Sequence, residues 1–128
     1  MKKLLTLSIF LSSYIFGYGQ LSYDARLKSK FSEKELVEMQ TKNAKNLEYL
    51  NFYVANAYQI NQMPSGKSNA HEIKGTIKVK DINNINIYEL NLNPLPKDYQ
   101  YYKIEGSDKL LVILSEDQIK EKFNQLKK

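Results

Sequence analysis

Few residues in this sequence are able to do chemistry. Cysteine is absent, and histidine occurs once, as His71 beside Glu72. Without cysteine the chain can form no disulfide, no thiolate nucleophile and no thiolate ligand for zinc or iron–sulfur clusters. A serine hydrolase would need His71 as its base, and the G-x-S-x-G nucleophile motif does not occur. Adjacent residues on a strand point to opposite faces, so we do not expect His71 and Glu72 to converge.

Three acidic residues of the strand-rich half are the remaining catalytic candidates. Glu89, Glu105 and Asp108 could gather at one end of a sheet, as the carboxylate pair of a glycoside hydrolase requires. Nothing in their spacing brings them together, and the chain has no tryptophan on which a sugar could stack. We therefore predict no catalytic residue, no metal site and no cofactor.

The charge of the chain bears on its partners. Its 128 residues include 19 Lys and Arg against 14 Asp and Glu, which gives a formal net charge of +5. These charges are spread along the sequence and form no basic stripe of the kind that tracks a phosphate backbone. We therefore do not expect a nucleic-acid partner.

Tyrosine is the unusual component of the composition, with 10 residues. Tyr99 and Tyr101 alternate along a predicted strand and so share one face, and tyrosine is favoured at interfaces because it offers an apolar ring and a hydroxyl together. Tyr49 and Phe52 lie on the side of a predicted helix opposite its main apolar stripe. Both pairs are candidate binding residues. The competing interpretation is that a neighbouring helix or sheet covers them as part of the core.

The first residues have the order of a secretory signal peptide. Lys2 and Lys3 precede the uncharged apolar run 4–16, and small residues follow around a cut before Gln20. The run is shorter than the roughly 20 residues that a membrane-spanning helix needs. We therefore expect residues 1–19 to be removed on export, leaving a product without a membrane span. No terminal sorting domain is visible, which favours the periplasm over the extracellular space.

Local signals predict one α+β domain over residues 31–128, preceded by a flexible lead-in over 20–30. Ser32 and Glu35 have the spacing of a capping box, in which each residue hydrogen-bonds the other's backbone amide. Ser115 and Gln118 repeat this spacing. The signals predict a helix from Glu33 with a break over 41–43, a helix over 44–59 and a C-terminal helix from Glu116.

The strand signals lie between the helices. Alternating or continuous apolar patterns predict strands over 74–80, 86–92, 99–104 and 109–114. Gly106 in a short polar loop favours a hairpin between the last two, and the final strand is apolar on both faces, which places it inside the sheet. Because helices and strands are segregated, we expect N-terminal helices, an antiparallel meander of about four strands and a C-terminal helix, cystatin-like in outline.

Four runs of the sequence carry a resemblance. EKELVEM, LEYLNFYV, NIYELNL and YYKIEGSDKLLVILSE resemble those of small exported proteins of Bacteroidota-type bacteria, over about residues 31–120. None of these runs is a catalytic motif. The resemblance implies export and a shared fold, and it brings no activity.

These observations favour a small exported, non-enzymatic protein that binds another macromolecule, such as an envelope protein, or supports an envelope process. The alternative is a small-ligand binder or hydrolase that uses a cavity between helix and sheet. A third hypothesis, an inhibitor of a secreted hydrolase, rests on the size of the chain and on the cystatin-like outline.

Overall fold

A computed structural model describes residues 22–63 and 72–127 of the chain. The predicted signal peptide and His71 lie outside these residues. The described part is α+β, as predicted, with three α-helices, one 3-10 helix and a four-stranded mixed sheet. In chain order the elements are η1 (Ala25–Ser29), α2 (Glu33–Lys42), α3 (Ala44–Asn56), β1 (Tyr58–Gln62), β2 (Ile73–Ile77), β3 (Gln100–Ile104), β4 (Lys109–Ile113) and α4 (Glu116–Leu126).

Both predicted helix starts are confirmed. The hydroxyl of Ser32 accepts a hydrogen bond from the amide of Glu35 at 3.1 Å, and α2 begins at Glu33. The hydroxyl of Ser115 likewise accepts from the amide of Gln118 at 3.2 Å. The predicted break between the first two helices is confirmed as well, because Asn43 leaves helical geometry and separates α2 from α3.

The second helix ends earlier than the sequence predicts. α3 stops at Asn56 and β1 starts at Tyr58, so the sheet gains a strand that the helical pattern concealed. Tyr58 fits the helical stripe by spacing. In the structure its hydroxyl instead accepts hydrogen bonds from Arg26 and from the amide of Ile85, each at 3.3 Å. Tertiary contacts thus override a local period that carried no glycine stop signal.

The sheet has the order β1-β4-β3-β2. β4 pairs antiparallel with β1 on one side and β3 on the other, which confirms the predicted hairpin and the interior place of β4. The prediction of an antiparallel meander is wrong at β2, which pairs parallel with β3. The long connection between β2 and β3, residues 78–99, explains this, because only a long crossover lets two successive strands run in the same direction.

The predicted strand over 86–92 does not form. The side chain of Asn86 accepts hydrogen bonds from the amides of Tyr88 at 3.1 Å and Glu89 at 3.4 Å, which bends the chain into a turn. Asn91 then adopts a positive φ of 56°, a conformation that asparagine tolerates better than most residues. The alternating apolar residues of this segment therefore pack from a compact loop and not from a strand.

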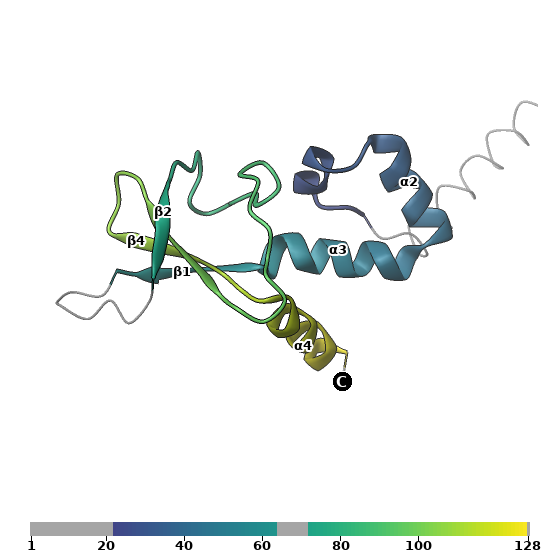
Figure 1. The fold of residues 1–128 in the computed structure, drawn as a ribbon. Helices are drawn as coiled ribbons and strands as arrows, with labels where there is room; N and C mark the ends of the chain where they lie inside the picture. Colours follow the sequence, from purple (N-terminus) through teal and green to yellow (C-terminus); the bar gives the residue numbers. More distant parts are fainter. Residues whose placement is uncertain (1–21, 64–71, 128) are drawn as a thin grey trace, which may run out of the picture.

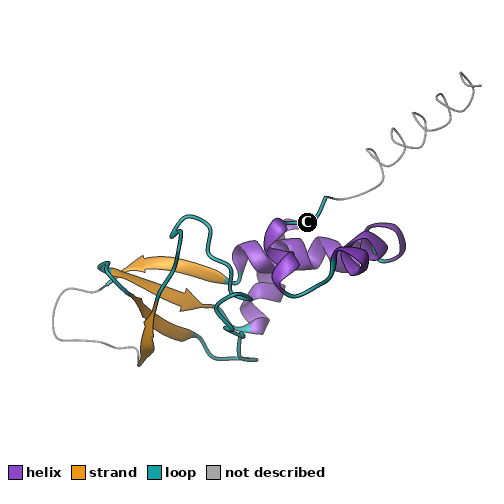
Figure 2. Cartoon of the chain, turned by 90° about the horizontal axis from the view of Figure 1, so that it is seen from above, coloured by secondary structure: helices purple, strands orange, loops and turns teal. Residues whose placement is uncertain are grey.

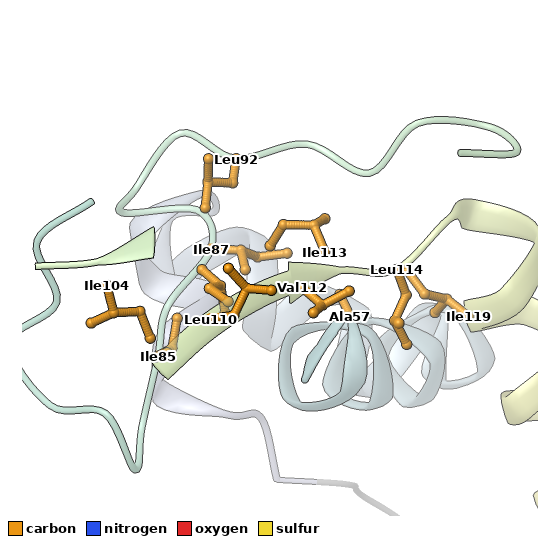
Figure 3. Packing of buried hydrophobic residues seen from close by; sticks show 11 residues of the cluster. Ala57, Ile85, Ile87, Leu92, Ile104, Leu110, Val112, Ile113, Leu114 and Ile119 are labelled. Carbon is orange, nitrogen blue, oxygen red and sulfur yellow. The ribbon is translucent and has the colours of Figure 1, made fainter. Parts of the chain in front are cut away.

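The main core lies between this loop and the sheet. Ile85, Ile87 and Leu92 of the loop are buried, and Figure 3 shows Ile85 and Ile87 beside Leu110 and Val112 of β4. Ala57, Leu114 and Ile119 extend the same cluster from the sheet to α4. The loop thus covers the sheet in the way that a predicted helix was expected to do.

A second core holds the N-terminal elements together. Leu27 of η1, Leu36 of α2, and Leu47 and Val54 of α3 are fully buried against one another. The structure differs here from the flexible lead-in expected over residues 20–30, because from Ser22 onward the segment packs on α3. The side chain of Asn51 accepts from the amide of Asp24 and donates to the carbonyl of Ser22, each at 2.8 Å.

Figures 1 and 2 show the helices gathered at one end of the sheet, with α3 leading into β1 and α4 following β4. This arrangement differs from the cystatin-like outline, in which a helix crosses the sheet. No helix among the described residues is both long and apolar enough to span a bilayer.

Candidate functional site

Tyr99 and Tyr101 meet at one surface groove. Tyr99 immediately precedes β3 and is 39% exposed, which makes it one of three large apolar side chains that are exposed in the described part of the chain. Tyr101, on β3, is half-buried. The groove has a volume of about 510 Å³ and is lined by Glu72, Lys74, Leu95, Lys97, Asp98, Tyr99 and Tyr101. The structure therefore brings together the two tyrosines that the strand pattern placed on one face.

The segment that carries Tyr99 is fixed at two points. The amides of Glu116 and Asp117, at the start of α4, donate to the carbonyls of Leu95 at 2.8 Å and Pro96 at 3.2 Å. These amides have no partner within the helix, so the 95–96 carbonyls satisfy them. Farther along, the side chain of buried Gln100 donates to the carbonyl of Asn93 at 2.7 Å. The groove wall is therefore preorganised by contacts that sequence spacing does not reveal.

The groove combines aromatic surface with balanced charge. Leu95 and the two tyrosines supply apolar area. The charges of Glu72 and Asp98 are balanced by those of Lys74 and Lys97. All four charged residues are exposed. A shallow site with two rings and both signs of charge is suited to holding a polar surface that also presents apolar groups.

Tyr49 and Phe52 lie elsewhere, in a joint between α3 and α4. Their rings contact the ring of Phe123, with centroids 5.1 Å and 5.3 Å away. Both are half-buried, and Lys127 at the end of α4 adds an ion pair to Glu48 at 2.6 Å. Phe123 of α4 thus covers the face of α3 that was a candidate partner surface. This arrangement favours the core interpretation for Tyr49 and Phe52.

The aromatic contacts continue from this joint into the N-terminal core. Tyr53 stacks on Tyr88 with centroids 5.9 Å apart, and Tyr88 meets Phe31 edge to face at 6.4 Å. Burial, reinforced by the neighbouring Tyr88, raises the pKa of the Tyr53 hydroxyl far above its ordinary value of 10.0. The folded chain therefore keeps the Tyr53 hydroxyl protonated at an alkaline pH at which the unfolded chain loses this proton.

We expect the free energy of unfolding to fall as the pH rises above about 10, because the Tyr53 hydroxyl then ionises in the unfolded chain before it ionises in the folded one. Because the pKa of the Tyr53 hydroxyl is raised in the folded state, the protonated hydroxyl contributes fully to the free energy of unfolding below the ordinary tyrosine pKa. This contribution is lost as the pH rises above it. Urea unfolding at pH 8 and pH 10.5 measures the loss. In Tyr53→Phe the loss should be smaller than in the wild type, and an equal loss in both chains would contradict the assignment.

Sequence reasoning missed the role of Arg26, whose side chain bonds several parts of the described chain. Its guanidinium donates to both carboxylate oxygens of Asp24, at 3.0 Å and 2.9 Å, and to the carbonyl of Ile85 at 3.0 Å. It thereby joins η1 to the loop over the sheet. An arginine in a polar segment without periodicity gives no local signal of this role. The one available signal is the Asp-x-Arg spacing, in which the aspartate can cap a helix and form an ion pair with the arginine.

A second groove, of about 480 Å³, lies beside Arg26 between η1 and the 78–90 loop. It is the nearest counterpart to the predicted helix–sheet cavity. Its polar groups are largely used within the chain, because Asn86 donates to Ser29 at 2.8 Å and Lys80 pairs with Glu89 at 2.9 Å. A ligand there would have to replace contacts that already exist.

The candidate carboxylates are dispersed over separate partners. Glu89 pairs with Lys80, Glu105 lies 3.8 Å from Lys78, and Asp108 accepts a hydrogen bond from Gln62. Within residues 22–63 and 72–127 no three histidine or acidic side chains are grouped so that they could hold a metal ion. Each of these three carboxylates therefore already has a lysine or amide partner of its own.

Comparison of the chain with family models, with curated proteins and with solved structures found no match.

Proposed function

We propose that this chain is a small exported protein that acts in the periplasm without catalysing a reaction, by binding another macromolecule through the Tyr99–Tyr101 groove. The supporting observation is the exposure of Tyr99 on a segment held rigidly by α4 and Gln100. A large ring on a backbone segment that is already held in place loses less conformational freedom on binding than one on a free loop, so it can serve as an interface anchor.

The competing hypothesis is small-ligand binding or hydrolysis in a cavity between helix and sheet. It would use the groove beside Arg26, and the internal hydrogen bonds of that groove count against it. A ligand screen followed by thermal unfolding separates the two hypotheses. A ligand that raises the melting temperature of the wild type, and less so of Lys80→Ala, would favour the competing one.

We predict that Tyr99→Ser/Tyr101→Ser weakens binding of a partner recovered from envelope extract by at least about tenfold, as expected when interface anchors are removed. Val37→Ser is the matched control, because Val37 is 46% exposed on α2, away from the groove. Binding of the purified partner to all three chains is measured by calorimetry after circular dichroism has shown that each is folded. Equal affinity of the wild type and the tyrosine variant would contradict the proposal.

Export is tested separately. Mass spectrometry of the protein from its native host should give a chain that begins at Gln20 in the periplasmic fraction. A cytoplasmic chain that retains residues 1–19 would contradict this part of the proposal.

A further inference from the structure

The two edges of the sheet differ in how they are protected against pairing with another strand. β2, at one edge, carries Lys74 on its exposed face and an irregular register against β3 between Ile73 and Gly75. Edge lysines and bulges both discourage a further strand from adding to a sheet. β1, at the other edge, has the sequence YQINQ, without charge, proline or irregularity.

In β1, the backbone amides and carbonyls of three residues point away from β4, toward the open edge of the sheet. The amide of Leu114 donates to the carbonyl of Ala57, and the amide of Met63 donates to the carbonyl of Asp108. Hydrogen-bonded pairs alternate in an antiparallel ladder, so Gln59 and Asn61 direct their backbone groups to β4. Tyr58, Ile60 and Gln62 then direct theirs away from the sheet. Within the described residues no backbone hydrogen bond joins these three to another element.

The β1 sequence is complementary to itself when reversed. An antiparallel pairing centred on Ile60 places Ile60 opposite its own copy, Tyr58 opposite Gln62, and Gln59 opposite Asn61. All three outward-facing residues then fall in hydrogen-bonded positions. Gln59 and Asn61 are exposed on the same face, where their amide side chains can bond each other across the seam. Because β1 carries no charge, the twofold axis brings no like charges together.

We infer that β1 forms the interface of a symmetric dimer, in which β1 of a second copy adds antiparallel at this edge and joins the two sheets into one. Water can solvate the outward amides and carbonyls of a strand edge, but another extended backbone is the protein partner that pairs with the whole row at once. Self-complementarity selects a second copy as the occupant, and the twofold axis closes the assembly without leaving a further β1 edge. Five residues bury less area than a stable interface requires, so the dimer is weak and depends on concentration.

Charge substitutions on the exposed face of β1 test this pairing. In Gln59→Lys/Asn61→Lys each new lysine faces a lysine of the other copy, and Gln59→Glu/Asn61→Glu opposes carboxylates in the same way. We expect each variant alone to dimerise at least about tenfold more weakly than the wild type. An equimolar mixture of the two should associate more tightly than either alone, because each lysine then faces a glutamate. Sedimentation velocity at concentrations from 10 µM to about 1 mM measures all three.

Thr76→Lys and Thr76→Glu on β2 are the matched controls, since they alter an exposed residue of the other edge strand. They should leave the association constant unchanged. Circular dichroism shows whether each variant is folded, and only folded variants are compared.

Amide exchange locates the interface independently in the unmodified chain. Protection of the Tyr58, Ile60 and Gln62 amides should rise with protein concentration, whereas the Gln59 and Asn61 amides should be protected throughout. A wild type that is monomeric at about 1 mM would overturn the inference. So would a dimer that survives the lysine substitutions, a mixture of the two variants that gains nothing, or a dimer whose Ile60 amide exchanges freely.

Discussion

Phe123→Ala is expected to lower the free energy of unfolding by about 2 to 3 kcal/mol. The Phe123 ring is half-buried and contacts Tyr49 and Phe52, so its removal takes away most of the apolar surface that fastens the C-terminal half of α4 to α3. A fully buried phenylalanine costs about 3 to 5 kcal/mol on truncation, and partial exposure reduces that figure. Urea denaturation followed by far-ultraviolet circular dichroism measures the change.

Two further variants show whether the loss arises from the ring. Phe123→Leu retains much of the buried area and should lose only about 1 kcal/mol. Lys127→Ala removes the ion pair to Glu48, which is partly exposed and should cost less than about 1 kcal/mol. If Tyr49 and Phe52 instead formed a surface for a partner, Phe123→Ala would leave stability unchanged.

The elements that sequence predicted well are those whose ends carry their own signals. Ser32 and Ser115 cap helices with hydroxyl-to-amide bonds that depend on residues only three positions away. β4 was recognised because an uninterrupted apolar strand has to be covered on both faces. Each of these inferences uses interactions that are complete within a few residues of chain.

The elements that sequence mispredicted depend on distant contacts. Tyr58 belongs to a strand because β1 pairs with β4, far away in the chain, and its hydroxyl also contacts Arg26 and the amide of Ile85. The residues of 86–92 alternate as in a strand, but the side chain of Asn86 competes for the backbone amides and turns the segment. Because no strand forms between them, β2 and β3 become direct neighbours and pair in parallel, whereas the predicted meander separated them by the 86–92 strand.

The candidate binding residues also differ in whether local signals or distant contacts determine their surroundings. Alternation alone puts Tyr99 and Tyr101 on one face. The groove that they line also needs the segment around Leu95, which is held by contacts with α4 that spacing does not reveal. For Tyr49 and Phe52, helical spacing gave the correct side of α3 but could not show that Phe123, about 70 residues later in the sequence, would cover it. Spacing identifies a face, and only tertiary packing determines whether solvent or another element meets it.

Arg26→Met is expected to destabilise the fold by about 2 to 3 kcal/mol. The side chain is only 14% exposed and bonds Asp24, the carbonyl of Ile85 and the hydroxyl of Tyr58. Methionine keeps the packing of the stem but leaves a partly buried carboxylate and a carbonyl without their donor. Losing one partner of such a pair costs more than the pair contributes net, because the remaining charge stays desolvated.

A double-mutant cycle distinguishes lost pairing from lost packing. If the stranded carboxylate causes much of the loss, Asp24→Asn/Arg26→Met should be more stable than Arg26→Met alone, because the double variant buries no unpaired charge. Equal stability of the single and double variants would assign the loss to the stem of Arg26 and to the bonds with Ile85 and Tyr58. Urea unfolding at pH 7 gives the free energy of unfolding of the wild type, of Asp24→Asn, of Arg26→Met and of the double variant.

The same pair sets a dependence on acid. Hydrogen bonds from Arg26 hold the pKa of the Asp24 carboxyl below its ordinary value of 3.8. The pair therefore contributes its full stability above the ordinary pKa of aspartate and loses it as pH falls through the lowered one. Between pH 6 and pH 2.5 the wild type should lose more stability than Asp24→Asn. An equal loss in the two chains would show that Arg26 stabilises Asp24 no more in the folded protein than water does in the unfolded one.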